Sequence, residues 1–237
     1  MISILRKIMP EKMPFFAAVS YAAGPAKIFM PQYRLMAKDV AEAVNPDRKT
    51  ECSNGAGAMI LDIGTGPGVV PLEIGLLEPA ARIIGVDVNE KMIEIAQKNK
   101  KKYGLTNVDF RVMDANALLF GDNTFGMIVS TDSLHHWKRP ARIIDEMYRC
   151  LKPGGEAWIY DGFSGASNKD IDAYIAGWPA GRPRFFPLYS MIRLILGIHG
   201  FSRKEYDTVI KGIVAKTQFK TCACQQRGVM MRVCLRK

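Results

Sequence analysis

The sequence predicts an α/β protein built on a Rossmann-like, doubly wound and mainly parallel sheet of seven strands. Three observations predict this fold. Apolar runs alternate with segments of helical pattern over residues 58–163. A glycine-rich loop, residues 64–68, directly follows the first apolar run. The final residues, 219–237, read as two strands joined by a turn, so we expect a C-terminal antiparallel hairpin.

Five parallel strands are expected before the hairpin. A continuous apolar run bounded by turn residues is typical of a parallel strand that is buried on both faces. Such strands need crossover connections, which the helical segments between them supply. The expected strands cover residues 58–64, 81–88, 108–115, 125–133 and 156–163.

The helices that separate the strands carry recognisable end signals. Asn89 is expected to cap a helix over residues 89–104, which ends at Gly104. Ser202 and Glu205 have the S-x-x-E spacing of a capping box at the start of a later helix. Two further helices are expected at residues 68–80 and 139–155, the second stopped by a Pro-Gly-Gly sequence.

The chain divides into a cap and a main domain. Residues 1–55 look like short helices separated by prolines, so we expect a helical N-terminal cap or lid over the main domain, residues 56–237. Residues 164–201 interrupt the strand-helix rhythm with an aromatic insertion that is expected to face the substrate. The apolar run 185–201 fits a pocket wall, a cap that buries itself, or a surface that rests on a membrane.

Composition and charge narrow the class of protein. The formal net charge is +10, yet residues 51–137 carry 7 basic and 11 acidic side chains, so the basic excess lies outside the glycine-rich half. This excess favours an anionic partner or is only a solvated surface. Five cysteines without paired CxxC motifs indicate reduced thiols in a cytoplasmic protein. No apolar stretch reaches the roughly 18 residues that a transmembrane helix needs.

The glycine-rich loop predicts a ligand site at the carboxyl end of the first strand. In a doubly wound sheet, ligands bind beyond the carboxyl ends of the strands, where the strand order reverses. Gly64 and Gly66 would allow a tight turn close to the ligand, and Gly68 would allow the next helix to pack closely. Asp87 ends the second strand and could bind both hydroxyls of a ribose. These features fit nicotinamide, flavin and S-adenosylmethionine equally.

Three further details favour S-adenosylmethionine. Asp62 stands two residues before Gly64, where a carboxylate would pair with a cationic amino group and repel a pyrophosphate. Asp114 ends the third strand and could hold the exocyclic amine of an adenine. The C-terminal hairpin is not expected of nicotinamide-binding folds.

Five segments together resemble the class I S-adenosylmethionine-dependent methyltransferases, especially the small-molecule branch that includes ubiquinone and menaquinone biosynthesis enzymes. The resemblance covers roughly residues 55–163 and the final hairpin in outline. It implies S-adenosylmethionine as cofactor and S-adenosylhomocysteine as product. The segments are LDIGTGPG (61–68), GVDVNEKM (85–92), VMDANALLF (112–120), FGMIVSTDSLHHW (125–137) and LKPGGEAWIYD (151–161).

The resemblance implies a role for each matching position. A proline that usually follows the third strand is missing from DANALLFGD, which leaves the contacts of residues 116–120 open. The implied cofactor-binding residues are Asp62, Gly64, Thr65, Gly66 and Gly68 for the methionine part, Asp87 for the ribose, Val88, Met92, Asp114 and Ala115 for the adenine, and Ser130 beneath the sulfonium.

The candidate catalytic residues are His135, His136 and Asp132, just past the fourth strand. Methyl transfer needs alignment in a dry site, and a base only where the acceptor loses a proton. Imidazole accepts a proton near neutral pH. Alternatively, one histidine packs against Trp137 and the other contacts the cofactor or caps the next helix. Adjacent histidines do not converge readily on a metal ion, so no metal site is expected.

Cys222 and Cys224 would lie on one face of a strand. Such a pair could bind a soft metal or an arsenical, or take part in redox chemistry. Two small side chains on a strand are more often core residues, and we expect core here.

The expected function is methyl transfer from S-adenosylmethionine to a small apolar, aromatic or lipid-like acceptor. The basic charge keeps a nucleic-acid methyltransferase open as an alternative. Against it, the chain has no Asn-Pro-Pro-Tyr-type motif and no appended RNA-binding module, so nucleic acid is not the expected partner. A non-catalytic S-adenosylmethionine-binding regulator and a nicotinamide dehydrogenase are further alternatives.

Overall fold

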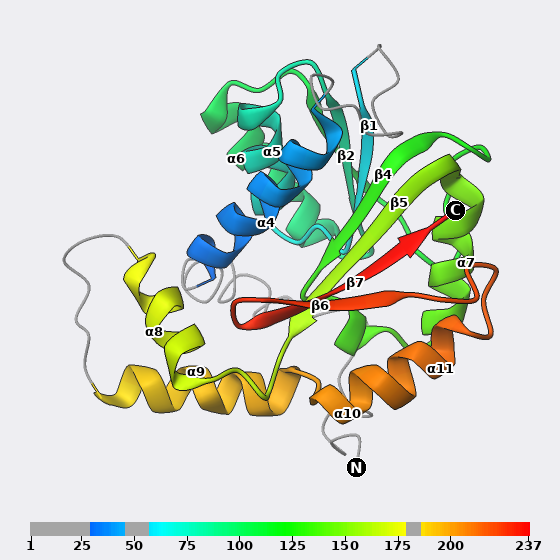
Figure 1. The fold of residues 1–237 in the computed structure, drawn as a ribbon. Helices are drawn as coiled ribbons and strands as arrows, with labels where there is room; N and C mark the ends of the chain where they lie inside the picture. Colours follow the sequence, from blue (N-terminus) through cyan, green and yellow to red (C-terminus); the bar gives the residue numbers. More distant parts are fainter. Residues whose placement is uncertain (1–28, 46–56, 179–185) are drawn as a thin grey trace.

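The computed structural model describes residues 29–45, 57–178 and 186–237 (Figure 1). Of the predicted N-terminal cap, it describes residues 29–45, which contain helix α4 (Met30–Val44). The expectations for the rest of residues 1–55 lie outside the described residues, as do those for residues 179–185.

Seven strands form a single sheet in the order β3-β2-β1-β4-β5-β7-β6. Neighbours among β1 to β5 pair in parallel, whereas β7 pairs antiparallel with both β5 and β6. This arrangement confirms the predicted α/β fold with its C-terminal hairpin, and the strand order reverses between β1 and β4. The strands are β1 (Met59–Ile63), β2 (Arg82–Asp87), β3 (Val108–Val112), β4 (Phe125–Thr131), β5 (Leu151–Gly162), β6 (Ala223–Arg227) and β7 (Met230–Arg236).

Helices cover both faces of the sheet. Helix α4 packs on α5 (Val69–Leu77), which in turn contacts α6 (Glu90–Tyr103). Figure 1 shows α4 and α5 on one side of the strands and α7 (Pro140–Cys150) with α11 (Lys211–Val214) on the other. The shorter elements are η1 (Leu134–His136), α8 (Asn168–Ala176), α10 (Arg203–Glu205) and the π-helical turn η2 (Tyr206–Ile210).

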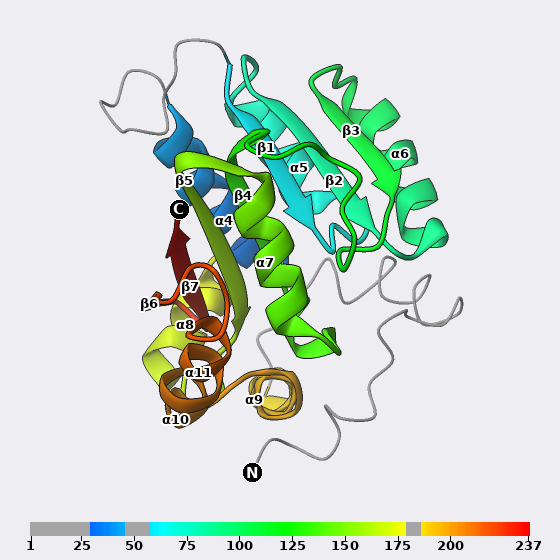
Figure 2. The same ribbon diagram turned by 90° about the vertical axis from the view of Figure 1, so that its right-hand side faces the viewer.

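Helix α9 (Phe186–His199) comes from the predicted insertion and crosses the carboxyl-terminal edge of the sheet, where Figure 2 shows it end-on below the strands. Its buried residues Leu188, Ile192 and Leu196 recur every four positions, so one stripe packs against the protein body. Leu194 lies away from this stripe and is 62% exposed. The idea that this run rests on a membrane stays a prediction.

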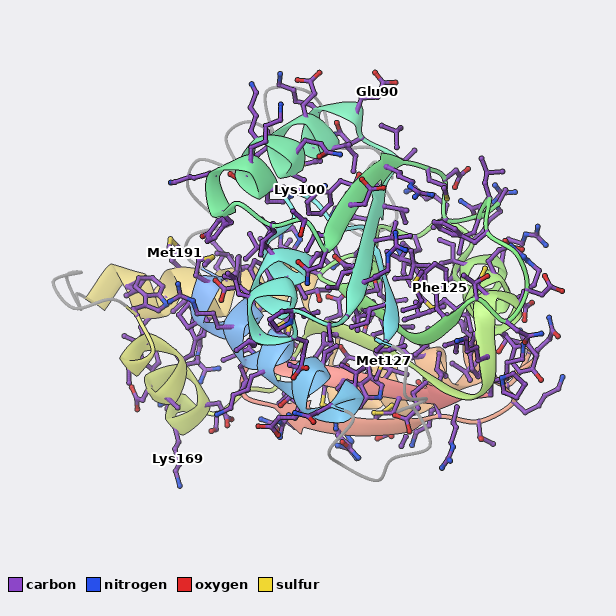
Figure 3. All side chains as sticks on the ribbon, turned by 90° about the horizontal axis from the view of Figure 1, so that it is seen from above. Glu90, Lys100, Phe125, Met127, Lys169 and Met191 are labelled. Atoms are coloured by element: carbon purple, nitrogen blue, oxygen red, sulfur yellow. The ribbon has the colours of Figure 1, made fainter. Side chains whose placement is uncertain are left out.

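The core is centred on β4, the middle strand of the seven-stranded sheet. Phe125, Met127 and Ile128 are completely buried, as expected for a parallel strand covered on both faces. Figure 3 shows Phe125 and Met127 inside the molecule, whereas Lys169 at the start of α8 projects away from it.

Most local end signals act as predicted. The Asn89 side chain accepts a hydrogen bond from the amide of Lys91 at 3.0 Å, and Gly104 ends α6 with a positive φ of 65°. Ser202 and Glu205 form the predicted reciprocal capping box.

Several predicted boundaries were wrong, among them the end of the helix at 68–80, which stops at Leu77, and the start of the fifth strand, which begins at Leu151. The helix expected over residues 139–155 ends at Cys150, because Leu151 is already paired with Phe125 as the first residue of β5. The third strand ends at Val112 rather than at residue 115, since the chain turns there toward the sheet edge that holds the cavity described below.

Asp39 fastens α4 to the C-terminal hairpin. Its carboxylate pairs with the Arg227 guanidinium, with Arg227 Nε donating at 2.8 Å, and lies 3.7 Å from Arg232. The Tyr160 hydroxyl approaches the same carboxylate at 3.4 Å. Gln32 adds a bond from its Nε2 to the Arg227 carbonyl at 3.1 Å. These contacts hold the α4 side chains against the carboxyl-terminal edge of the sheet.

Gly68→Ala is expected to destabilise the protein by about 2–3 kcal/mol, measured by urea unfolding. Gly68 has a φ of +81°, and an added Cβ would lie 2.5 Å from the Phe110 ring and 2.9 Å from the Ala96 Cβ. The matched variant Gly66→Ala, at a φ of +53° with nothing within 4 Å, carries backbone strain alone and should cost about 1 kcal/mol. Equal costs for the two variants would contradict the packing role of Gly68.

Candidate functional site

A cavity of about 520 Å³ opens at the carboxyl ends of β1, β2 and β4, under α9. This volume lies within the roughly 300–1,000 Å³ of small-molecule sites. The cavity also sits at the reversal of strand order, as the fold class predicts. Among the predicted site residues, those that line it are Asp62, Gly64, Thr65, Gly66, Asp87, Val88, Met92, Asp114, Ala115, Asp132, His135 and His136.

The glycine-rich loop forms one wall of the cavity and is tied to β2. The amides of Gly64 and Thr65 both donate to the Val86 carbonyl, at 2.9 and 3.0 Å. Gly64 has a φ of +72°, and an added Cβ would lie 2.7 Å from the Ser133 Cβ. A side chain at this position would therefore strain the backbone and press on the opposite wall.

Asp87 organises the junction between the loop and α6. Its two oxygens accept hydrogen bonds from the amides of Gly66 at 2.9 Å and Asn89 at 2.8 Å. Each carboxylate oxygen has a further lone pair, so these bonds still allow Asp87 to accept from ribose hydroxyls.

Asp62 is the most unusual group of this half of the cavity. It is only 2% exposed, and among the described residues neither its Oδ1 nor the Thr65 Oγ1 has a hydrogen-bond partner. Burial, together with the nearby Asp87 carboxylate, raises the pKa of Asp62 to about 7. Buried polar atoms without partners are costly, so both atoms are suited to a polar, cationic ligand group.

Asp114 and Met92 lie on the side of the cavity where the adenine is predicted. Met92 is 4% exposed and provides an apolar wall. Asp114 is exposed, and its Oδ1 accepts from the amide and the Nδ2 of Asn116, both at 2.8 Å.

Two predicted cofactor residues do not line the cavity. Gly68 lies behind the loop against Phe110. Ser130 is fully buried, donates its hydroxyl to the Ile63 carbonyl at 2.8 Å and lies 2.6 Å from the Ser133 hydroxyl. Ser133 is the serine that lines the cavity at this point.

The predicted catalytic residues gather just past the carboxyl end of β4, where they line the cavity. Asp132 has a positive φ of 50°, and its Oδ2 accepts the Tyr33 hydroxyl of α4 at 3.1 Å. Burial and the neighbouring Asp161 carboxylate raise the pKa of Asp132 to about 7. The ring centroids of His135 and His136 are 4.2 Å apart.

The structure adds two residues that the sequence reasoning missed. Asp161, 1% exposed, lies 2.9 Å from Nδ1 of His135 and accepts the His135 amide at 3.0 Å. His199, at the end of α9, places its Nδ1 3.3 Å from Nε2 of His135. Asp161 could have been found, because it ends the fifth strand beside the fourth. No signal in the sequence pointed to His199.

The cysteine pair lies on the edge strand and beside it, away from these histidines. Cys222 and Cys224 are half-buried and pack against the core, and within the described part of the chain no group of three metal-ligating side chains is placed to hold an ion. A hydrogen bond from Cys222 lowers the pKa of the Cys224 thiol to about 7.

The cavity residues fit S-adenosylmethionine as a bound group. The Asp62 Oδ1 atom, which has no partner among the described residues, suits an ammonium group, Asp87 suits a ribose, and the loop leaves room for a backbone approach. Among the described helices, none combines the length and the apolar character needed to cross a membrane.

Known proteins are similar to this chain in sequence and in fold. Residues 61–159 match the family described as methyltransferase domain. A ubiquinone/menaquinone biosynthesis C-methyltransferase of Desulfotalea psychrophila is 35% identical over 114 residues, 48% of this chain and 45% of that protein. The enzyme of the same name from Pseudomonas putida is 28% identical over 183 residues, 68% of this chain and 71% of that protein.

A solved structure agrees with these matches. A putative S-adenosyl-L-methionine-dependent methyltransferase of Methanococcus maripaludis superposes with a TM-score of 0.71 at 20% identity, covering 94% of this chain and 92% of the other. At this identity the likeness shows the fold. Residues 61–159 thus form a methyltransferase domain, and the chain resembles S-adenosylmethionine-dependent methyltransferases, among them the ubiquinone/menaquinone biosynthesis enzymes.

Proposed function

We propose that this enzyme methylates a small, apolar aromatic acceptor of the quinol type, which loses a hydroxyl proton during the reaction. The observation that carries the proposal is the buried Asp161–His135 pair at one end of a cavity whose other end holds the predicted cofactor residues. The names of the quinone-biosynthesis relatives support the same acceptor class.

The cofactor half of the cavity is proposed to bind and orient the methyl donor. S-adenosylmethionine, when bound, supplies an activated methyl group. Asp62 would pair with its ammonium group, Asp87 would accept its ribose hydroxyls, and Met92 would pack against its adenine. These contacts place the methyl group without taking part in proton transfer.

The acceptor half is proposed to lie between α4, η1 and α9. It is lined by apolar and aromatic side chains, which exclude water and favour a ring-shaped ligand. We propose that residues 164–201 serve as the acceptor-facing part of a main domain spanning 56–237, with residues 1–55 as its cap. The described side chains of this half include Phe29, Tyr33, Trp137, Ile195, Leu196 and Met230.

The polar groups of the acceptor half supply acid–base chemistry. Asp161 holds Nδ1 of His135 and would stabilise a positive charge on that ring. Asp132, bonded to the Tyr33 hydroxyl, and His136 complete the proposed catalytic group. A hydroxyl placed here would lose its proton while the methyl group arrives from the opposite end of the cavity.

Calorimetric titration with S-adenosylmethionine, S-adenosylhomocysteine and NADH tests the cofactor half. We expect micromolar binding of the first two and none of NADH. Asp87→Asn should weaken binding by about tenfold, because it removes a charged acceptor of the ribose hydroxyls. Since Asp87 also accepts two backbone amides, a thermal melt of the variant serves as the control for its fold.

Transfer of a labelled methyl group to quinol, lipid and RNA extracts then tests the acceptor. Labelling confined to the quinol fraction supports the proposal. Salt-sensitive labelling of RNA would replace it with a nucleic-acid methyltransferase. Cofactor binding without transfer to any pool would favour a regulatory protein.

A further inference from the structure

We propose that His199, rather than His135 or His136, is the catalytic base that faces the methyl acceptor, with His135 and Asp161 as positioning residues that receive the proton by relay. The inference rests on the proposed function, because it concerns an acceptor that loses a proton. It assigns a catalytic role to a residue of the insertion helix α9, outside residues 61–159, which match the methyltransferase domain.

The positions of the three side chains define a line from the sheet to the cavity wall. Asp161 ends β5 and is 1% exposed, and His135 in η1 is 8% exposed. The distances along the line are 2.9 Å from Asp161 Oδ1 to His135 Nδ1 and 3.3 Å from His135 Nε2 to His199 Nδ1. The ring of His199 lies edge-on to that of His135, with centroids 5.1 Å apart.

Hydrogen bonding assigns the tautomers. The Asp161 side chain accepts hydrogen bonds from the amides of His135 and Gly162, so its oxygens act as acceptors and Nδ1 of His135 is the donor to them. Nε2 of neutral His135 then carries the lone pair and accepts Nδ1–H of His199. Neutral His199 with its proton on Nδ1 has its own lone pair on Nε2. His199 lines the cavity beside Leu196.

This order of donors leaves His135 unsuited to attack the acceptor proton directly. Its Nδ1 is held by Asp161 and its Nε2 faces His199, so an acceptor would have to displace the His199 ring to reach Nε2. Other titratable groups that face this region are Asp132, Tyr33 and His136, from the β4 end, α4 and η1.

The proton and electron balance of the relay is simple. The acceptor hydroxyl proton moves to Nε2 of His199, and the Nδ1 proton of His199 moves to Nε2 of His135. The electron pair left on the acceptor increases its nucleophilicity. The oxygen that lost its proton forms its bond to the methyl carbon while the sulfur–methyl bond breaks and that electron pair goes to sulfur. His135 ends as an imidazolium beside the Asp161 carboxylate.

Kinetics with an isoprenoid 1,4-naphthohydroquinone and labelled S-adenosylmethionine test the base. His199→Gln should lower kcat about 100-fold with little change in the cofactor KM, and imidazole in the buffer should restore part of the activity of His199→Ala. Leu194→Ala, an exposed change on the same helix, should retain full activity. A loss of less than threefold for His199→Gln, or no rescue of His199→Ala, would overturn the proposal.

Nitrogen-15 NMR of the histidine rings, in the S-adenosylhomocysteine complex, tests the relay without any acceptor. The chain has 3 histidines, so the spectrum can be assigned by single substitutions. We expect Nδ1–H tautomers for both His135 and His199, and a change of the His199 tautomer ratio in His135→Asn but not in His136→Asn. An Nε2–H tautomer of His199 that is unchanged in His135→Asn would contradict the relay.

The two experiments separate this inference from the proposed function. If the naphthohydroquinone is not methylated but the ring nitrogens behave as expected, the acceptor class fails and the hydrogen-bonded relay stands. If the quinol is methylated and the His199 variants stay active, the acceptor class stands and His199 is not the base.

Discussion

Asp62→Asn is expected to weaken S-adenosylmethionine binding about 100-fold at pH 7.5 and, at the same pH, to raise the unfolding free energy of the free protein by about 1–2 kcal/mol. The carboxylate is 2% exposed and its Oδ1 has no partner among the described residues. The buried carboxylate therefore destabilises the free protein, and it makes a favourable interaction only when a cation lies next to it. Calorimetry and urea unfolding of the same samples measure the two effects.

Because the pKa of Asp62 is raised, both the stability of the free protein and its affinity for S-adenosylmethionine should depend on pH. Its folded-state pKa of about 7 lies above the ordinary aspartate value of 3.8, so the folded protein binds the proton more tightly than the unfolded chain. The carboxyl group therefore lowers stability progressively as the pH rises from about 4 to 7. Asp132, raised to about 7 as well, acts in the same direction. Affinity for the cofactor should instead rise about tenfold between pH 5.5 and 7.5, and this rise should shrink in Asp62→Asn.

Asp109→Asn is the matched control for Asp62→Asn. It removes the same charge from an exposed carboxyl group of β3, whose side chain is 45% exposed and pairs only at the surface with Arg111. We expect unchanged cofactor affinity and stability within about 0.5 kcal/mol. If Asp62→Asn bound the cofactor within threefold of the parent protein, the assignment of Asp62 to the ammonium group would be wrong.

Asp39→Ala is expected to lower the unfolding free energy by about 3 kcal/mol. The substitution removes the carboxylate that faces Arg227 and Arg232, and it leaves the buried Tyr160 hydroxyl without that acceptor. Because Arg232 is only 14% exposed, water compensates its charge poorly. Urea unfolding measures the change, and the cofactor affinity should fall as well, since α4 contributes Tyr33 to the cavity.

A double-mutant cycle with Arg227→Ala tests whether the cost of Asp39→Ala comes from the ion pair. The losses of unfolding free energy in the two single variants should add up to about 1–2 kcal/mol more than the loss in the double variant. Glu94→Ala breaks an exposed pair with Lys91 and should leave the free energy of unfolding nearly unchanged. An Asp39→Ala variant no less stable than Glu94→Ala would show that α4 is held by its apolar contacts alone.

The parts of the fold that followed from the sequence are those with a local physical signal. Continuous apolar runs predicted β1 and β4 because a parallel strand covered on both faces has no polar side to show. The glycines at 64, 66 and 68 have positive φ values, which other residues adopt only with strain, so the turn was readable from residue type. The end of α7 was misplaced because pairing of Leu151 with β4, a tertiary contact, overrode the Pro-Gly-Gly signal.

The candidate site likewise has a part that could be predicted from the sequence and a part that could not. The cofactor half was predicted as a set, because its residues stand at strand ends that a doubly wound sheet brings to one edge. Ser130 was predicted beneath the sulfonium, yet its hydroxyl is bonded to the Ile63 carbonyl and Ser133 lines the cavity. A sequence motif does not show which of two nearby residues, here Ser130 or Ser133, turns its side chain toward the cavity.

The sequence by itself determined the order of strands and helices along the chain, the edge of the sheet that holds the cavity, and the class of cofactor. Hydrophobic period, capping residues and glycine conformation act over a few neighbouring residues, so these features can be read without the fold. Tertiary structure alone decided which groups meet in the acceptor half. Asp161 reaches His135 across 26 positions and His199 reaches it across 64. These contacts depend on which strands are neighbours in the sheet and on how the insertion folds back over it, and packing of the whole chain sets both.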